Sequence, residues 1–382
     1  CDRRQRQMCI RDSSYSDGMM RNNNYKRNTL SFRQSYSLFN KKLNVDLSLN
    51  YVQAKTKNRP GGGTVMNPLY DLYRMPRNVD LNYYKENYYI ENGKWTSNEQ
   101  SYFDSKNNKW TTGTVELTGP KQEWAYWQNG MNNPYWMVNT RNSISEEERA
   151  YGYISANYQI IDGLKIQGRL SLDRTKMKGT SERMATTWNI SAMEDYGMYG
   201  QDLNWINEVY VDALLSYDKQ IKDFSISATT GWTGHTLKGE TQKLWAKATT
   251  ANWKHDTMPT LINFFEPSVS QGNVSERSYT LSSNWDKGLL FTGQIGWQEK
   301  VYLEGSYRRD WYRAFKQYSY RGTPTNYGYF SVGANALLHQ IVTLPEVITN
   351  LKVRASYSEV GNSIPNVLYN AVSYTHLTLP TI

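Results

Sequence analysis

Apolar and polar side chains alternate with a period of two residues between positions 164 and 173. One parity holds the apolar residues Leu164, Ile166, Leu170 and Leu172, and the other holds Lys165, Gln167, Arg169, Ser171 and Asp173. This period is that of a β-strand with one apolar and one polar face, and no helix sorts these residues in the same way. Asp162-Gly163 directly precedes the stretch and is a signal for a tight hairpin turn, because Gly accepts a positive φ. Residues 152–176 are therefore predicted to form an antiparallel hairpin.

The same unit recurs along the chain. Further alternating segments lie within residues 28–58, 206–234, 289–307, 327–336 and 351–357. Short turns and long polar stretches of unequal length connect them, an asymmetry typical of up-and-down membrane barrels. A soluble sandwich would also bury apolar strand faces, but most of its connections are short. The pattern predicts an all-β fold, namely a partial antiparallel transmembrane β-barrel of roughly 10 to 13 strands with long extracellular loops.

The two strand parities predict two surfaces. The polar parity is expected to face the barrel lumen and supplies the candidate residues Lys165, Arg169, Asp212, Glu304, Arg308, Lys352 and Arg354. The apolar parity is expected to face lipid and includes Leu164, Ile166, Val211, Leu215, Val301 and Leu303. A single β-bulge would invert the assignment for the strand that contains it.

Residues 59–150 lack sustained strand alternation and are rich in Pro, Gly, Asn and aromatic residues. A stretch of this length without strands is unusual inside a compact domain, so a large folded loop is expected. Its candidate contacts to a ligand or partner are Trp124, Tyr126, Trp127, Tyr135 and Trp136. They form either a stacking surface for sugar rings or a partner, or the core of the loop itself. The second interpretation is favoured for most of them, because a loop of this size needs a core.

Composition narrows the function classes. Aromatic residues make up 14% of the 382-residue chain, which suits either a barrel with aromatic girdles or a carbohydrate-binding protein. The formal net charge of +9 is concentrated in the first sixty residues without a compact basic stripe, so no nucleic-acid partner is expected. No run of 18 apolar residues is present, so no helical membrane span is expected.

No catalytic or metal-binding motif stands out. The 2 cysteines, Cys1 and Cys9, leave no thiol for the body of the chain, and the 4 histidines lack metal-ligand spacing. No nucleophile-elbow motif is found. Neither an enzymatic activity nor a cofactor is expected.

The two ends differ in character from the remainder. Residues 1–13 and 372–382 resemble translated sequencing-adaptor read-through, so they are expected to be non-native segments around a partial barrel domain, residues 14–371. The alternative is a genuine basic arm and a genuine last strand.

Four strings resemble the SusC/RagA type of TonB-dependent outer-membrane transporter. They are Asn132-Asn133-Pro134-Tyr135-Trp136, the segment 300–310 (KVYLEGSYRRD), the segment 329–334 (YFSVGA) and the segment 351–362 (LKVRASYSEVGN). Their order and spacing are similar to those in the middle and later part of that family's barrel, and the last string is the most specific.

The resemblance implies an outer-membrane location and a 22-stranded barrel with an N-terminal plug. It also implies a SusD-like surface lipoprotein and the TonB complex as partners, with import of oligosaccharides or peptides. The plug, the TonB-contacting segment and the last strands of the family are not found in this sequence. Two alternatives stay open: a secreted or surface β protein that binds glycans through the aromatic loop and, less favoured, an outer-membrane hydrolase.

Overall fold

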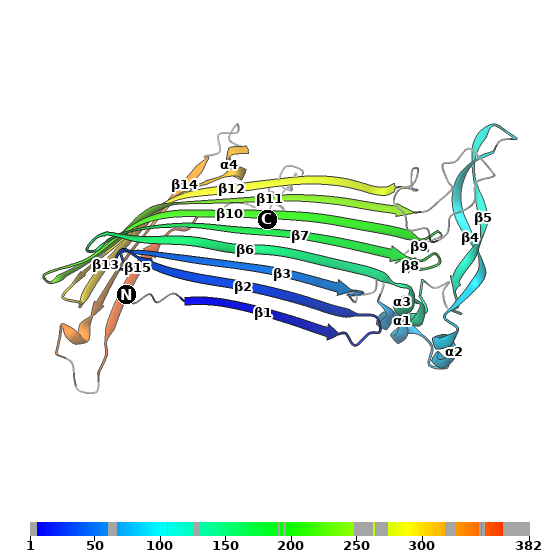
Figure 1. The fold of residues 1–382 in the computed structure, drawn as a ribbon, viewed down its shortest axis with the longest axis horizontal. Coiled ribbons are helices and arrows are strands. Elements are labelled where there is room, and N and C mark those ends of the chain that lie inside the picture. Colours follow the sequence, from blue (N-terminus) through cyan, green and yellow to red (C-terminus); the bar gives the residue numbers. More distant parts are fainter. Residues whose placement is uncertain are drawn as a thin grey trace, which may run out of the picture.

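The structure is a computed structural model that describes residues 6–59, 67–104, 106–125, 130–189, 192–193, 196–247, 263, 274–317, 325–343, 345 and 348–361. Its main element is a sheet of 11 strands, in which every neighbouring pair is antiparallel. In sheet order the strands are β1 (Arg6–Asp17), β2 (Asn24–Leu38), β3 (Leu43–Lys57), β6 (Asn142–Ile161), β7 (Leu164–Arg183), β10 (Met198–Ile221), β11 (Phe224–Lys247), β12 (Val274–Trp297), β13 (Val301–Tyr312), β14 (Asn326–Leu337) and β15 (Lys352–Ser358). The sheet is curved, and β13 to β15 turn away behind the long central strands (Figure 1).

One side of the sheet, which we call the apolar face, exposes large apolar side chains. On this face Leu49, Leu172 and Leu289 are 52%, 53% and 49% exposed. They belong to an apolar band made by the apolar-face residues of 43–51, 164–172 and 289–297, three stretches of nine residues next to the tight turns. A strand that crosses a bilayer needs about 9 to 11 residues. The band therefore has the height of a hydrocarbon core.

The long strands continue far beyond this band. β10, β11 and β12 each contain 24 residues, and β6 and β7 each contain 20. Beyond the band the apolar face becomes polar, with Gln53 and Lys55 on β3 and Arg174 and Lys176 on β7. The strands thus have an apolar half next to the turns and a polar half next to the long connections.

The hairpin predicted at Asp162-Gly163 is present. Gly163 has a φ of +84°, and its carbonyl oxygen accepts a hydrogen bond of 2.8 Å from the backbone N–H of Asp218 on β10. An added side chain would be strained by that φ and would crowd the Asp218 carbonyl. Glycine therefore permits both the turn and its contact with the neighbouring strand.

Residues 59–150 contain more regular structure than the sequence pattern predicts. The excursion, as we call residues 67–141, comprises α1 (Pro68–Arg74), α2 (Leu81–Glu86), a two-stranded sheet of β4 (Tyr89–Asp104) and β5 (Lys109–Gln122), and α3 (Pro134–Thr140). Asn67, Asp80 and Asn133 cap the three helices through their side-chain oxygens. The β4–β5 hairpin stands beside the far ends of the long strands (Figure 1).

The expected end of the loop at residue 150 is wrong, because β6 begins at Asn142. Glu146, Glu147 and Glu148, a run suggestive of a loop or helical turn, lie in this strand. Glu146 is paired with Lys55 at 2.8 Å and lies opposite Lys178. Cross-strand pairs of opposite charge stabilise the beginning of β6. This segment therefore lacks the alternation of apolar and polar residues by which a strand is recognised in a sequence.

The first strand does not continue the apolar band. The pairing of β1 with β2 places Arg11 opposite Leu30 on the apolar face and Ile10 opposite Ser31 on the other face. The expectation that residues 1–13 are non-native stays a prediction, and residues 372–382 lie outside the described residues. In the part of the chain that the structure describes, no helix is both long enough and apolar enough to cross a membrane. The minor strands β8 (Trp188–Asn189) and β9 (Ala192–Met193), helix α4 (Arg313–Gln317) and a 3-10 turn, η3 (Leu338–Gln340), complete the described elements.

Candidate functional site

The side opposite the apolar face carries all seven polar candidates, and we call it the polar face. Residues paired directly across an antiparallel sheet point to the same side. Arg169 pairs with Asp212, and successive cross-strand pairs connect Asp212 to Asp310 on β13. Arg308 and Glu304 share the parity of Asp310 and therefore lie on the same face. Glu304 pairs with Gly333, and Gly333 pairs with Ser356 on β15. Lys352 and Arg354 share the parity of Ser356 and therefore lie on the same face as Glu304. Lys165 shares the parity of Arg169. Their exposure to a lumen stays a prediction.

One continuous row of mostly polar residues crosses this face. We call it the central polar row; from β2 to β14 it comprises Ser35, Asp46, Ser155, Arg169, Asp212, Thr233, Gly288, Asp310 and Tyr327. Asp212 and Asp310 are each only 2% exposed. A buried carboxylate requires a compensating cation or hydrogen-bond donor.

Asp212 obtains that compensation from the neighbouring strand. The guanidinium Nε of Arg169 donates a hydrogen bond of 2.7 Å to Asp212 Oδ2, and the same guanidinium lies over the ring of Tyr210. Asp212 Oδ1 is buried and receives no hydrogen bond from the residues that the structure describes. Asp212 Oδ1 can therefore accept a further hydrogen bond.

Asp310 lies at the centre of a denser cluster. Arg308 Nε donates to both carboxylate oxygens, at 2.9 and 3.0 Å, and the hydroxyl of Tyr329 donates at 2.8 Å. The hydroxyl of Tyr312 lies 3.4 Å away. A Cβ at Gly288 would collide with the Asp310 carboxylate, so this glycine makes room for the cluster. The arrangement fixes one cation and two phenols on the polar face.

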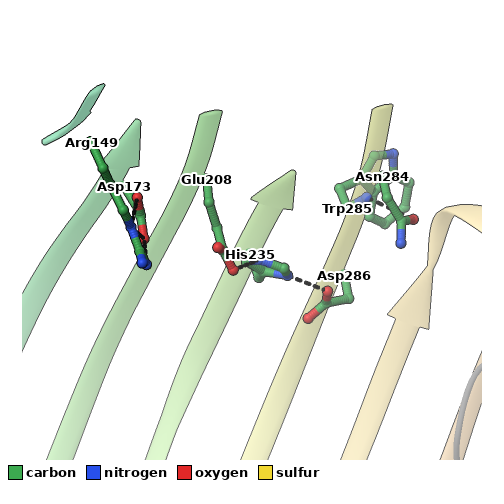
Figure 2. Close-up of polar contacts among 7 residues, drawn as sticks. All are labelled: Arg149, Asp173, Glu208, His235, Asn284, Trp285 and Asp286. Carbon is green, nitrogen blue, oxygen red and sulfur yellow. Dashed lines mark hydrogen bonds and ion pairs between the residues drawn. The ribbon is translucent and has the colours of Figure 1, made fainter. Parts of the chain in front are cut away.

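Two further charged groups lie on the same face, in the halves of the strands next to the long connections. Figure 2 shows their contacts. Arg149 binds Asp173 through Nε, at 3.0 and 3.1 Å, and lies over the ring of Tyr151. His235 is placed between two carboxylates, with Nδ1 2.8 Å from Asp286 and Nε2 2.7 Å from Glu208. Both ring nitrogens face acceptors, which suits the doubly protonated imidazolium.

The remaining polar candidates are more isolated. The Glu304 side chain lies over Gly333, where no Cβ obstructs it. Lys165, Lys352 and Arg354 are exposed. The structure therefore brings together Arg169 with Asp212, and Arg308 with Asp310, but does not gather the seven candidates into one cluster.

The candidates from the excursion take a different position. Trp136 is 1% exposed and donates from Nε1 to the hydroxyl of Thr187 at 2.9 Å. Trp124 is 2% exposed and packs edge-on against Tyr84, with ring centroids 4.9 Å apart. Tyr135 is half-buried, and Tyr126 and Trp127 lie outside the described residues. Trp124 and Trp136 thus belong to the core of the excursion.

Asn132 and Asn133, which precede Pro134, belong to a hydrogen-bond network between the excursion and the connection from β7 to β10. Asn132 accepts from the backbone N–H of Trp188 at 2.8 Å and donates to its carbonyl oxygen at 3.1 Å. Gln122 accepts from the backbone N–H of Asn133 at 2.9 Å and donates to the carbonyl oxygen of Thr186. These amides are almost fully buried and their hydrogen bonds are satisfied, so the motif is structural.

Two carboxyl groups outside the sheet have shifted pKa values. Burial raises the pKa of Asp71 on α1 above its ordinary value, and the N–H of Asn132 and the charge of Arg74 partly oppose this shift. The exposed turn residue Asp162 has a lowered pKa, because Lys219 donates to its carboxylate. Among the described residues, no group of His, Cys, Asp and Glu suits a metal ion.

Sequence reasoning missed most partners of the charged candidates. Asp310 follows Arg308 at the spacing of one strand face, and His235 shares that face with Thr233. Strand parity is therefore the signal that could have placed Asp310 and His235 on the polar face. The pairing that buries Asp310 depends on the alignment of β12 with β13, which parity does not give.

No protein-family model matches the sequence, and no curated protein matches it either. Among solved structures, the RagAB peptide transporter is similar to the chain with a TM-score of 0.61 and 16% identity, over 93% of this chain and 35% of that chain. The "open-open" state of the RagAB peptide importer gives a TM-score of 0.60 and 15% identity, over 88% of this chain and 32% of that one.

The likeness concerns fold, and the chain spans about a third of the length of the transporters it matches. It agrees with the resemblance that the four sequence strings indicate, and the prediction of an all-β, partial barrel fold is confirmed. The chain has the fold of part of the β-barrel seen in the RagAB peptide transporter structures.

Proposed function

We propose that this chain is part of a TonB-dependent outer-membrane transporter that imports peptides or oligosaccharides. The observation that carries the proposal is the inverted distribution of side chains: Leu172 is 53% exposed on one face, while Asp212 is 2% exposed on the other. In water such a sheet would expose a contiguous apolar surface, which soluble monomers avoid. In a bilayer the same surface meets acyl chains.

The polar face supports the transport part of the proposal. Arg169 with Asp212 and Arg308 with Asp310 place fixed charges along one side of the curved sheet. Polar interiors of membrane barrels form aqueous passages or contact a plug. The likeness to RagAB structures adds the fold of a transporter barrel.

A SusD-like lipoprotein partner and coupling to TonB follow from the same proposal. The excursion offers a surface for such a partner at the end of the sheet that is far from the tight turns (Figure 1). It exposes Tyr73, Tyr83 and Tyr89, at 86%, 51% and 44%. Tyrosines of this kind are enriched in interfaces and in sugar-stacking surfaces. The secreted glycan-binding alternative shares this observation but leaves the apolar band exposed to water.

The experiment expresses the complete gene that contains these residues and follows the product by membrane fractionation and by heat-modifiable migration in gels. A barrel is expected in the outer-membrane fraction, with a folded form that migrates differently from the boiled form. Uptake of labelled oligopeptides and oligosaccharides, with and without a functional TonB system, then tests transport. Recovery as a soluble periplasmic or secreted protein would refute the proposal and favour the glycan-binding alternative.

A further inference from the structure

Two hollows adjoin each other on the apolar face of β2, β3, β6 and β7. The first has a volume of about 620 Å³ and is lined mainly by apolar side chains, among them Phe32, Leu49, Ile154 and Leu172. It exists because β6 contributes only Ala150 and Gly152 between the larger side chains of β3 and β7. A Cβ at Gly152 would overlap the backbone oxygen of Ser48, so no larger residue fits there unless the backbone moves.

The second hollow lies beyond the apolar band and is lined largely by charged residues. Its volume is about 320 Å³, and its lining includes Lys26, Lys55, Glu146, Lys176 and Lys178. Direct cross-strand pairs connect Lys26 with Lys55, Lys55 with Glu146, and Glu146 with Lys178. Arg174 lines the first hollow, and Lys176 follows it on the same face of β7. The apolar hollow therefore opens directly onto the cations.

Cations exceed carboxylates on this part of the apolar face. The cations are Lys26, Lys55, Arg174, Lys176 and Lys178, and the carboxylates are Glu146 and Glu148, an excess of five minus two, or three positive charges. Glu147 also lines the second hollow, but its side chain belongs to the polar face by parity. Glu146 binds Lys55 at 2.8 Å, and Lys26 lies directly opposite Lys55 on the other side. Like charges in such a cross-strand pair are destabilising, so an anion that contacts Lys26 would stabilise this part of the sheet.

We propose that the two hollows together bind a phosphate-bearing lipid of the lipid A class. Its acyl chain occupies the hollow at Gly152, and its phosphate contacts Lys26, Lys176 and Lys178. The inference rests on the proposed function, which places the apolar face in a membrane. A free phosphate would leave the apolar hollow empty, whereas an uncharged lipid would leave the excess of cations without a counterion.

The choice of lipid A follows from which end of the strands carries the cations. The tight turns lie at one end of the apolar band, and the cations lie beyond its other end, on the parts of β2, β3 and β7 next to the longer connections. The excursion lies at that same end of these strands (Figure 1). Membrane barrels have short periplasmic turns and long extracellular loops. The cations therefore lie at the outer leaflet, where the phosphorylated lipid of a Gram-negative outer membrane is lipid A.

The test measures lipid retention by native mass spectrometry on the complete transporter, purified in detergent and titrated with lipid A. The triple substitution K26Q/K176Q/K178Q is expected to weaken lipid A binding by about five-fold per cation, the effect typical of a basic side chain near anionic lipid. A matched control is K238Q/K287Q, which removes two cations from the same face on β11 and β12 and is expected to leave binding unchanged.

The apolar hollow is tested separately. A150W fills it and is expected to weaken lipid A binding, whereas A213W adds the same side chain to the apolar face of β10 outside the hollow and is not. Dephosphorylated lipid A and phosphatidylglycerol are titrated as competitors and are expected to bind more weakly. Equal binding of either competitor, or equal losses in variants and controls, would overturn the inference. A transporter that enters the outer membrane but retains no lipid A would refute this inference alone, while a soluble product would refute the proposed function as well.

Discussion

The sheet and the excursion bury opposite kinds of side chain. In the excursion, Trp136 and Leu117 are 1% and 2% exposed, as in a water-soluble domain. In the sheet, Leu172 is 53% exposed and Asp310 is 2% exposed. Both regions come from one chain and obey the same hydrophobic effect. The difference shows that they fold against different solvents: water around the excursion and, in our proposal, lipid around the apolar band.

The largest expected effect is a loss of stability in the excursion alone, caused by replacing its buried tryptophan. Trp136→Ala removes a buried ring and its hydrogen bond to Thr187, at a cost of about 3 to 5 kcal/mol to the excursion. Limited proteolysis of the complete protein would then cut within residues 67–141 while the sheet stays protected. Tyr73→Ala is the control, because this ring is 86% exposed and its loss is expected to change little. Equal protection of both variants would contradict a buried core in the excursion.

The next effect tests which solvent surrounds the apolar band. Leu170 lies near the middle of the band, and Leu170→Arg is expected to cost about 2 to 4 kcal/mol of folding free energy in a bilayer. Leu281 lies on the same face beyond the band and is 67% exposed, so Leu281→Arg is expected to be nearly neutral. Reversible unfolding in phospholipid vesicles measures both. If the two substitutions cost the same, the band does not lie in lipid.

A smaller effect concerns the polar face. Asp310→Asn removes the charge that Arg308 and Tyr329 bind, and the loss of charge-assisted hydrogen bonds is expected to cost about 1.5 to 3 kcal/mol. Asp162→Asn breaks an exposed ion pair with Lys219 at a tight turn, and no measurable change is expected. Denaturant titration of the complete barrel distinguishes the two. An unchanged midpoint for Asp310→Asn would mean that this cluster does not stabilise the sheet.

The smallest effect is a pH dependence within the excursion. Burial raises the pKa of Asp71 above the ordinary value of 3.8, so the folded state holds its proton more tightly than the unfolded state does. The contribution is complete below 3.8 and is lost as the pH rises through the raised pKa. Asp71→Asn, which has no proton to lose, is expected to flatten the pH dependence of protease resistance in this interval. An identical pH profile for both proteins would contradict the shift.

The two regions also differ in how far their sequence predicts them. In the sheet the two-residue period identified the apolar halves of most strands, and Asp162-Gly163 identified a turn. The period identified neither β1 nor the polar beginning of β6. The excursion gave no such signal, so its helices and its β4–β5 hairpin were not expected. Asn133 before Pro134 is a recognisable helix start, yet it stands among so many Pro and Asn breaks that the composition suggested a loop. The buried position of Trp136 depends on Thr187, which is 51 residues away.

The sequence by itself determined which side chains share a strand face, because that property depends only on the alternation of neighbouring residues along one strand. It therefore separated Arg169 and Arg308 from Leu170 and Leu303. Only the tertiary structure decided which residues meet across strands, because register depends on distant segments. That register placed Asp212 beside Arg169, opened the hollow at Gly152, and brought Lys26 to the same surface as Lys178.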